Sequence, residues 1–191
     1  GVREPAEAVS GARPRLQFVV QEQQLGTGHA LLQTRPLLEG KKGLFFLLSG
    51  DVPLLTSGTL RSLIDTHTQC EAAATVVTAE MPRPFGYGRI VRSSGRISKI
   101  VEERDASPAQ RKITEINSGI YAFDLPPLFG ALDSIGTANS QGEYYLPDLV
   151  DINRRDGRVV EAVKLDDADE IRGTNTRAEL AEVGRVLQGR I

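Results

Sequence analysis

The chain has 191 residues, 40% of them hydrophobic and 25% charged, and its formal net charge at pH 7 is −2. These values predict a single water-soluble domain without a membrane span, and the interspersed charges argue against nucleic-acid or membrane partners. The only cysteine, Cys70, excludes an internal disulfide framework and a cysteine-based zinc site, and without a hydrophobic leader the cytoplasm is the expected location.

The first half of the chain predicts strands that alternate with helices. Three apolar segments read as strands: residues 16–20, 44–48 and 72–77. A helix is predicted between the first two, over about residues 29–38, with Gly26 and Gly28 opening it. A second helix has Ser57 as its expected N-cap. This βαβαβ order is typical of a parallel sheet.

The second half begins with a turn-rich loop at residues 81–88 and continues with shorter elements. A hairpin is predicted from residues 89–91 and 97–101, because Gly95 in its connection can adopt a positive φ. The remaining expected elements are a strand at 116–123, helices at 127–132 and 146–154, a strand at 159–163, and an amphipathic helix at 177–187.

Residues 44–53 form the most informative stretch. Five apolar residues run into Ser49, Gly50 and Asp51, which fits a strand buried on both faces of a parallel sheet. Such strands present ligands at their carboxyl ends, where metal or phosphate chemistry would place a carboxylate. Alternatively, Asp51 caps the strand and opens a turn before Pro53. This stretch alone leaves both interpretations open.

Polar loops, rather than histidines, carry the candidate chemistry. His29 is expected to pack or cap a helix and His67 to occupy a half-buried helical position, so a histidine-based triad or zinc site is not indicated. Seven loops combine glycine with an acid, amide or tyrosine: residues 21–28, 49–51, 85–88, 102–103, 117–119, 142–148 and 173–175. Together they point to nucleotide-phosphate handling with Mg²⁺, although each loop alone could be a simple turn.

In chain order, the motifs resemble those of the sugar-nucleotidyltransferase family. They are QEQQLGTGHA (21–30), SGDVPL (49–54), GYGRI (86–90), IVE (100–102), EINSGI (115–120), QGEYYL (141–146) and GTN (173–175). Within that family the chain is similar, from about Phe18 onward, to the uridylyltransferase domain of bacterial bifunctional UDP-N-acetylglucosamine pyrophosphorylase/glucosamine-1-phosphate N-acetyltransferases. The resemblance implies an α/β, Rossmann-like nucleotide-diphospho-sugar transferase fold, N-terminally truncated, with a mixed, mostly parallel sheet and flanking helices.

The resemblance also implies a reaction and its participants. A phosphate oxygen of N-acetylglucosamine 1-phosphate would attack the α-phosphorus of UTP, giving UDP-N-acetylglucosamine and pyrophosphate. The implied site residues are Gln21, Gly26 and Thr27 at the uracil base, Ser49 and Gly50 beside the nucleotide, Gly88, Glu102, Asn117 and Tyr145 at the sugar, and Asp51 and Asn175 as catalytic ligands of Mg²⁺. A phosphate monoester is mostly ionised at neutral pH, since its second pKa is about 6, so no strong protein base is required.

The chain also departs from the family. We expect residues 1–191 to be one partial domain, because neither the glycine-rich triphosphate loop of the first βα unit nor the carboxyl-terminal β-helix domain is visible. The corresponding expectations are low or absent activity, and homo-oligomer formation through that β-helix domain. Pro147 stands where a hydroxyl residue is usual, which predicts a weaker sugar contact. Two alternatives stay open: a sibling enzyme for glucose or mannose 1-phosphate, and a catalytically silent sugar-nucleotide-binding or regulatory relative.

Overall fold

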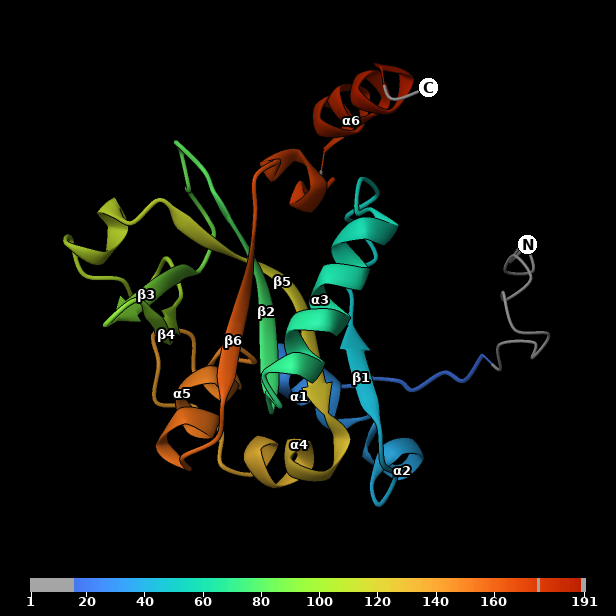
Figure 1. Ribbon diagram of the computed structural model, residues 1–191, viewed down its shortest axis with the longest axis vertical. Coiled ribbons are helices and arrows are strands. Elements are labelled where there is room, and N and C mark those ends of the chain that lie inside the picture. Colours follow the sequence, from blue (N-terminus) through green and yellow to red (C-terminus); the bar gives the residue numbers. More distant parts are fainter. Residues whose placement is uncertain (1–15, 175, 190–191) are drawn as a thin grey trace.

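The computed structural model describes residues 16–174 and 176–189, which form a six-stranded sheet flanked by helices (Figure 1). The strands are β1 (Leu44–Leu47), β2 (Ala74–Glu80), β3 (Arg89–Ser93), β4 (Arg96–Val101), β5 (Glu115–Asp124) and β6 (Val160–Leu165). The α-helices are α1 (Thr27–Leu32), α2 (Arg35–Leu38), α3 (Ser57–Gln69), α4 (Leu125–Leu132), α5 (Asp148–Arg155) and α6 (Arg177–Gly189). Two short 3-10 helices are η1 (Gln110–Lys112) and η2 (Ala168–Ile171).

Helix α3 shows how local sequence produces these elements. Its N-cap is Thr56, one residue before the predicted Ser57, and the Thr56 hydroxyl accepts a hydrogen bond from the Thr59 N–H. Leu63 and His67 lie on the buried face of the helix. His67 is buried rather than half-buried, its Nδ1 lies 2.9 Å from the Thr75 hydroxyl, and burial lowers its pKa. His67 is therefore a packing residue of the fold.

The predicted helix over residues 29–38 is two helices. Helix α1 ends at Leu32, and the Thr34 hydroxyl donates to the Leu31 carbonyl at 2.7 Å in the turn before α2. Pro36 lies in the first turn of α2. Proline has no N–H to continue the hydrogen bonds of α1, so the chain starts a new helix there.

The sheet is mixed, and the expectation that it would be mostly parallel is wrong. Its order is β4-β3-β5-β2-β6, with β1 also paired to β5. Among the described strands only the β2 and β6 pair is parallel, and the other four pairings are antiparallel. The β3 and β4 strands are joined by a tight hairpin, which permits only antiparallel pairing, and β5 runs opposite to each of its neighbours.

Two expectations for the first strands also fail. The segment 16–20 forms no strand, and its Phe18 and Val20 side chains are 82% and 75% exposed. Strand β1 is half-buried throughout and, within the described chain, pairs only with β5. A central strand buried on both faces needs neighbours on both edges, and β1 has one on a single edge.

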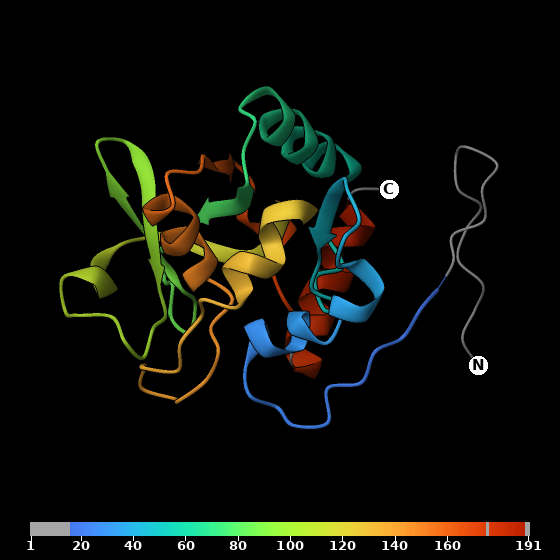
Figure 2. The ribbon, with the colours of Figure 1, turned by 90° about the horizontal axis from the view of Figure 1, so that it is seen from below.

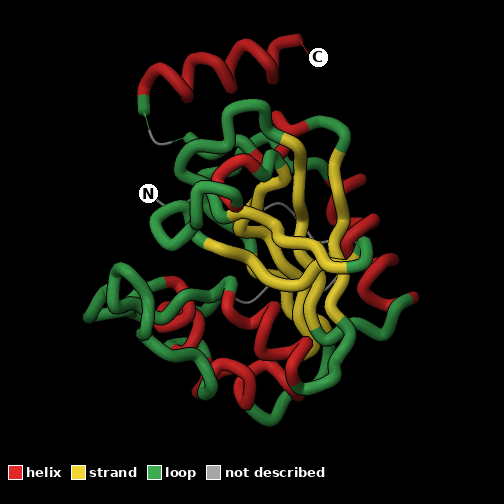
Figure 3. Tube along the Cα trace, turned by 90° about the vertical axis from the view of Figure 1, so that its left-hand side faces the viewer, coloured by secondary structure: helices red, strands yellow, loops and turns green. Residues whose placement is uncertain are grey.

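Helices cover both faces of the sheet. One apolar cluster joins α1, α4 and α5 to residues such as Val76 and Tyr121, and the other joins α3 and η2 to residues such as Val77 and Ile120. In Figure 2, α3 lies at the top and α1 at the bottom, with β1 between them. Figure 3 shows the strands as one twisted layer, with α6 outside it. Across residues 16–174 and 176–189, every helix is too short or too polar to span a bilayer.

Strand β5 creates the opening in which polar residues gather. One edge of β5 pairs with β2, and its other edge pairs with β1 near Tyr121 and with β3 near Ile116. On β2, Val76 pairs with Tyr121, and Thr78 pairs with Asn117. The single residue between them, Val77, therefore faces three residues of β5, 118–120. This β-bulge lies in the interval between β1 and β3 and redirects the side chains there.

Candidate functional site

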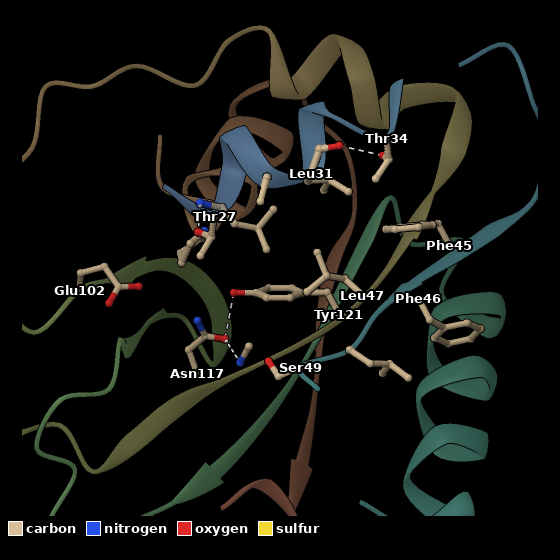
Figure 4. A pocket seen from close by; sticks show the side chains of 15 residues that line it. Thr27, Leu31, Thr34, Phe45, Phe46, Leu47, Ser49, Glu102, Asn117 and Tyr121 are labelled. Atoms are coloured by element: carbon tan, nitrogen blue, oxygen red, sulfur yellow. Dashed lines mark hydrogen bonds between the residues drawn. The ribbon is translucent and has the colours of Figure 1, made fainter. Parts of the chain in front are cut away.

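A cavity of about 460 Å³ lies over the β5 bulge (Figure 4). Its floor is apolar, and polar groups stand on one side of it. The residues that line it are Thr27, Ala30, Leu31 and Thr34 from α1 and its end, Phe45, Phe46, Leu47, Leu48 and Ser49 from β1 and its end, Glu102 after β4, Asn117, Gly119 and Tyr121 from β5, and Leu146 and Pro147. An apolar cavity with a few convergent polar groups is the usual form of a small-molecule site.

The structure brings together three residues predicted to bind the sugar. Gly88 is buried between the other two: a Cβ added to it would lie 3.2 Å from Glu102 Oε1 and 3.5 Å from Asn117 Cβ. The Asn117 N–H also donates to the Gly88 carbonyl at 2.9 Å. The added Cβ would be tightest against Ile100, 3.1 Å from its Cγ2, and against Glu102, which explains the preference for glycine.

Tyr145, the fourth predicted sugar residue, lines an adjoining cavity of about 300 Å³. Glu102 and Pro147 border both cavities, so the two share a wall. The Tyr145 hydroxyl accepts a hydrogen bond from Gln141 Nε2 at 2.7 Å. The sugar residues of the sequence prediction thus lie in one region, although Tyr145 does not line the larger cavity.

The predicted base loop is tied to the segment that carries Tyr145. The Gly28 N–H donates to the Tyr144 carbonyl at 2.8 Å, and the Leu146 N–H donates to the Thr27 hydroxyl at 3.1 Å. Gly26 lies so close to this segment that an added Cβ would be 2.7 Å from the Tyr144 carbonyl oxygen. Hydrogen bonds from both backbone and side-chain atoms therefore fix the predicted base loop against the segment that carries Tyr145.

Gln21 belongs to the same loop but does not line the cavity. Its Nε2 donates to the Gly26 carbonyl at 3.1 Å and lies 3.0 Å from His29 Nδ1. Of the three predicted base residues, only Thr27 lines the cavity of Figure 4. His29 packs against this loop and against Tyr144, as expected for a structural residue.

The segment after β1 leads away from the cavity floor toward solvent. Ser49 lines the cavity, and its Oγ would lie 3.3 Å from a Cβ added to Gly119. Gly50 and Asp51 are exposed. The Asp51 carbonyl accepts hydrogen bonds from the Thr174 N–H at 2.9 Å and from the Thr174 hydroxyl at 3.2 Å.

Asn175, the predicted second metal ligand, lies outside the described residues. Its sequence neighbour Thr174 nevertheless fixes the carboxyl-terminal segment to Asp51. Among the residues that the structure describes, no group of three or more histidine, cysteine, aspartate or glutamate side chains could hold a metal. Any metal here would therefore rely on fewer such side chains, supplemented by amide, backbone or ligand oxygens.

Sequence reasoning missed two polar residues of this region. Tyr121 lines the cavity, is 1% exposed, and donates a hydrogen bond to Asn117. Arg89 is 2% exposed, and its guanidinium pairs with Glu103 and donates to the Tyr87 carbonyl. The even spacing of Asn117 and Tyr121 along one strand was a signal that both point to the same face. The partner of Arg89 was not visible from sequence, because Glu103 lies in the turn after β4 and is brought to Arg89 by the pairing of β3 with β4.

Burial dominates the electrostatics of Glu102. Desolvation raises the pKa of its carboxyl group, the negative charges of Asp105 and Asp148 raise it further, and Arg89 opposes the shift. A carboxylate with these surroundings is costly to ionise and gains from a ligand that donates hydrogen bonds to it.

The Glu102→Gln variant is expected to be more stable than the wild-type chain at pH 7. The pKa of Glu102 in the folded chain exceeds its ordinary value of 4.5. Ionisation of Glu102 therefore opposes folding as the pH rises from 4.5 through the pKa of the folded chain. As the pH falls below 4.5, the carboxyl group becomes protonated in the unfolded chain as well as in the folded chain, and the advantage of the variant should shrink. Thermal unfolding of both proteins between pH 4 and pH 8 measures the difference in stability. If the advantage of the variant over the wild-type chain were smaller at pH 7 than at pH 4, the raised pKa of Glu102 would be contradicted.

The fold and the cavity define a class of protein: an α/β protein that gathers polar loops at strand ends around one cavity. Residues 3–164 match the nucleotidyl transferase family, and the chain belongs to that family. It is therefore a nucleotidyltransferase domain by sequence as well as by architecture.

Individual relatives agree with this assignment. The chain is 50% identical over 188 residues to the "Bifunctional protein GlmU" of Syntrophotalea carbinolica, covering 97% of the chain and 40% of that protein. It is 48% identical over 192 residues to the protein of the same name from Pelotomaculum thermopropionicum, covering 100% of the chain and 41% of the relative. The chain thus spans about two-fifths of the length of these curated relatives.

A solved structure shares the fold. It is a crystal structure, in complex with a sucrose, of a Bacillus anthracis protein assigned as a glucose-1-phosphate thymidylyltransferase. The TM-score is 0.61 at 18% sequence identity, and the match covers 89% of the present chain and 64% of the other. The likeness confirms the nucleotide-diphospho-sugar transferase architecture expected from the sequence.

Proposed function

We propose that the chain forms the sugar- and base-binding part of a uridylyltransferase that converts UTP and N-acetylglucosamine 1-phosphate into UDP-N-acetylglucosamine and pyrophosphate. The observation that carries the proposal is that Glu102 and Asn117, which meet beside Gly88, line one cavity together with Thr27 and Ser49. Bifunctional GlmU proteins at 48–50% identity support the choice of substrates.

The cavity suits an acetamido sugar. Glu102, when ionised, accepts hydrogen bonds from hydroxyl or amide N–H groups, whereas an asparagine amide can donate to a carbonyl oxygen. An N-acetyl group presents both an N–H and a carbonyl. Ala30, Leu31 and Leu146 supply apolar surface on the same cavity wall. Glucose and mannose 1-phosphates lack the acetamido group and would leave one of the two polar side chains without its partner.

The proposed reaction is an in-line displacement at phosphorus. An oxygen of the sugar phosphate forms a bond to the α-phosphorus of UTP while the bond to the β-phosphate bridging oxygen breaks and pyrophosphate leaves. The nucleophile is already an anion at neutral pH, so the residues of this chain serve to position it and to exclude water. The contacts of Gly28 and Thr27 with the segment 144–146 would keep base and sugar sites at a constant separation.

Asp51 and Asn175 are the proposed protein ligands of Mg²⁺. The Asp51 carboxylate fits this role because it is exposed at the carboxyl end of β1 and, among the described residues, forms no ion pair. Carboxylate and amide oxygens are ligands that Mg²⁺ prefers. When bound, the ion would neutralise phosphate charge and lower the repulsion between two anionic substrates. Thr174 supports the pairing by binding the Asp51 backbone.

The remaining parts of the proposal concern context. We propose that residues 1–191 belong to one nucleotidyltransferase domain, that its partners are the two substrates and two products rather than nucleic acid or membrane, and that it acts in the cytoplasm. Association into homo-oligomers would depend on a β-helix domain such as the resemblance implies.

A substrate panel tests the proposal. Pyrophosphate release is measured with glucose, mannose and N-acetylglucosamine 1-phosphates, each with UTP, GTP and dTTP, and calorimetry measures binding of UDP-N-acetylglucosamine. The expected result is preference for UTP with N-acetylglucosamine 1-phosphate. A faster reaction with GTP or dTTP would overturn the uridylyl assignment. Binding without turnover would favour the catalytically silent relative. The absence of binding would contradict both the uridylyltransferase proposal and the silent relative.

A further inference from the structure

Asn117 is held by two hydrogen bonds that use the same atom. Its Oδ1 accepts the Tyr121 hydroxyl at 2.9 Å and the Gly119 N–H at 3.0 Å. Gly119 lies in the β5 bulge, where it adopts a φ of +78°, and Tyr121 lies next to the bulge on the same strand. The carbonyl oxygen of the Asn117 amide is therefore fully used inside the protein.

The amide nitrogen of Asn117 is left for a ligand. The hydrogen bonds found within the described residues include none from Asn117 Nδ2, and Asn117 lines the cavity. In Figure 4 the nitrogen points away from both dashed bonds, on the side of Glu102. A flipped amide would place its NH₂ group against the Gly119 N–H, which can only donate, and would lose that bond, while the Tyr121 hydroxyl would have to become an acceptor.

Tyr121 is well suited to hold this orientation. Its ring is 1% exposed and stacks on Phe123 with a centroid distance of 5.4 Å, so the hydroxyl has a constant position. Burial raises the pKa of Tyr121, so the hydroxyl retains its single proton and donates it to Asn117. The Tyr121 side chain belongs to the apolar cluster on this face of the sheet and also lines the cavity.

We infer that Tyr121 is a positioning residue that locks the Asn117 amide so that only hydrogen-bond donors face the sugar. Resting on the proposed function, this inference assigns the specificity of the site: Asn117 selects a ligand acceptor oxygen, such as an acetamido carbonyl, while neighbouring Glu102 selects a donor. The proposed order of contacts is Tyr121 hydroxyl to Asn117 Oδ1, then Asn117 Nδ2 to the ligand oxygen.

A double-mutant cycle with Tyr121→Phe and Asn117→Asp tests the inference. Dissociation constants are measured by calorimetry for UDP-N-acetylglucosamine, with Mg²⁺-UTP as the ligand that lacks the sugar. Tyr121→Phe removes one neutral hydrogen bond, so its affinity for the sugar nucleotide should fall by about three- to tenfold. Asn117→Asp keeps both internal bonds but has no donor to offer, so its affinity should fall by roughly tenfold or more. Binding of UTP should change little in either variant.

The double variant separates positioning from general stability. An aspartate presents an oxygen to the ligand in either orientation, so Tyr121→Phe should cause no further loss of affinity in the Asn117→Asp background. Thr75→Val is the matched control: it removes a buried hydroxyl that pairs with His67 on the other face of the sheet, and it should lower the melting temperature without changing affinity.

Each outcome has a defined meaning. Additive losses in the double variant, or an unchanged affinity of Tyr121→Phe, would overturn the positioning role while the proposed function stands. Retained affinity in Asn117→Asp would show that the ligand does not need the donor, which also overturns the inference. If the wild-type chain does not bind UDP-N-acetylglucosamine, the proposed function fails, and the inference fails with it.

Discussion

Replacement of Asp51 by alanine is expected to abolish magnesium-dependent binding of UTP, with a loss of affinity of at least about tenfold. Asp51 is exposed at the carboxyl end of β1, and its backbone carbonyl, rather than its carboxylate, holds Thr174. The substitution removes a proposed metal ligand and leaves that backbone contact in place. Calorimetric titration of UTP with and without Mg²⁺ measures the effect, and the melting temperature should stay near that of the wild-type chain.

Asp65→Ala provides the matched control for charge. Asp65 is an exposed aspartate of helix α3, and its replacement changes the net charge by the same amount. It should leave the magnesium dependence of UTP binding intact. Unchanged binding in Asp51→Ala would instead assign Asp51 to the turn before Pro53, the simpler of the two interpretations that the sequence left open.

The Gly26→Ala variant is expected to lose about 3 kcal/mol of unfolding free energy and most of its affinity for the sugar nucleotide. Gly26 has φ 106° and ψ 174°, a conformation essentially restricted to glycine. The added Cβ would also lie 2.7 Å from the Tyr144 carbonyl oxygen and 2.9 Å from the Tyr144 nitrogen. Backbone atoms cannot move aside as a flexible side chain can, so the base loop must separate from residues 144–146.

Gly40→Ala isolates the contribution of backbone conformation. Gly40 has φ +77°, and an added Cβ would meet nothing within 4 Å. Its cost should be only about 1 kcal/mol, with no effect on ligand affinity. Denaturant unfolding and calorimetry on both variants give the comparison. Equal stability losses, with affinity retained in Gly26→Ala, would show that contact with the Tyr144 segment does not hold the site together.

Local patterns predicted most individual elements but not how they pair. The β3 and β4 hairpin, α4, β6 and α6 were all anticipated from apolar periodicity and from glycine and proline positions. The strand expected at residues 16–20 did not form, and the sheet was expected to be mostly parallel but is mixed. Strand identity depends on nearby residues, whereas pairing depends on partners distant in the sequence, such as β1 with β5.

The sequence by itself determined the family, the order of the polar loops and the residue types available for chemistry, including Asp51 as a carboxylate at the end of an apolar strand. All three can be read from the sequence, because each motif is a short run of neighbouring residues and the motifs follow one another in a fixed order. Only the tertiary structure decided that Glu102 and Asn117 meet beside Gly88, and that Gly88 must be small because Ile100 and Glu102 lie close to it. Such contacts join separate segments of the chain, and hydrogen-bond direction is settled only where donors and acceptors meet in space.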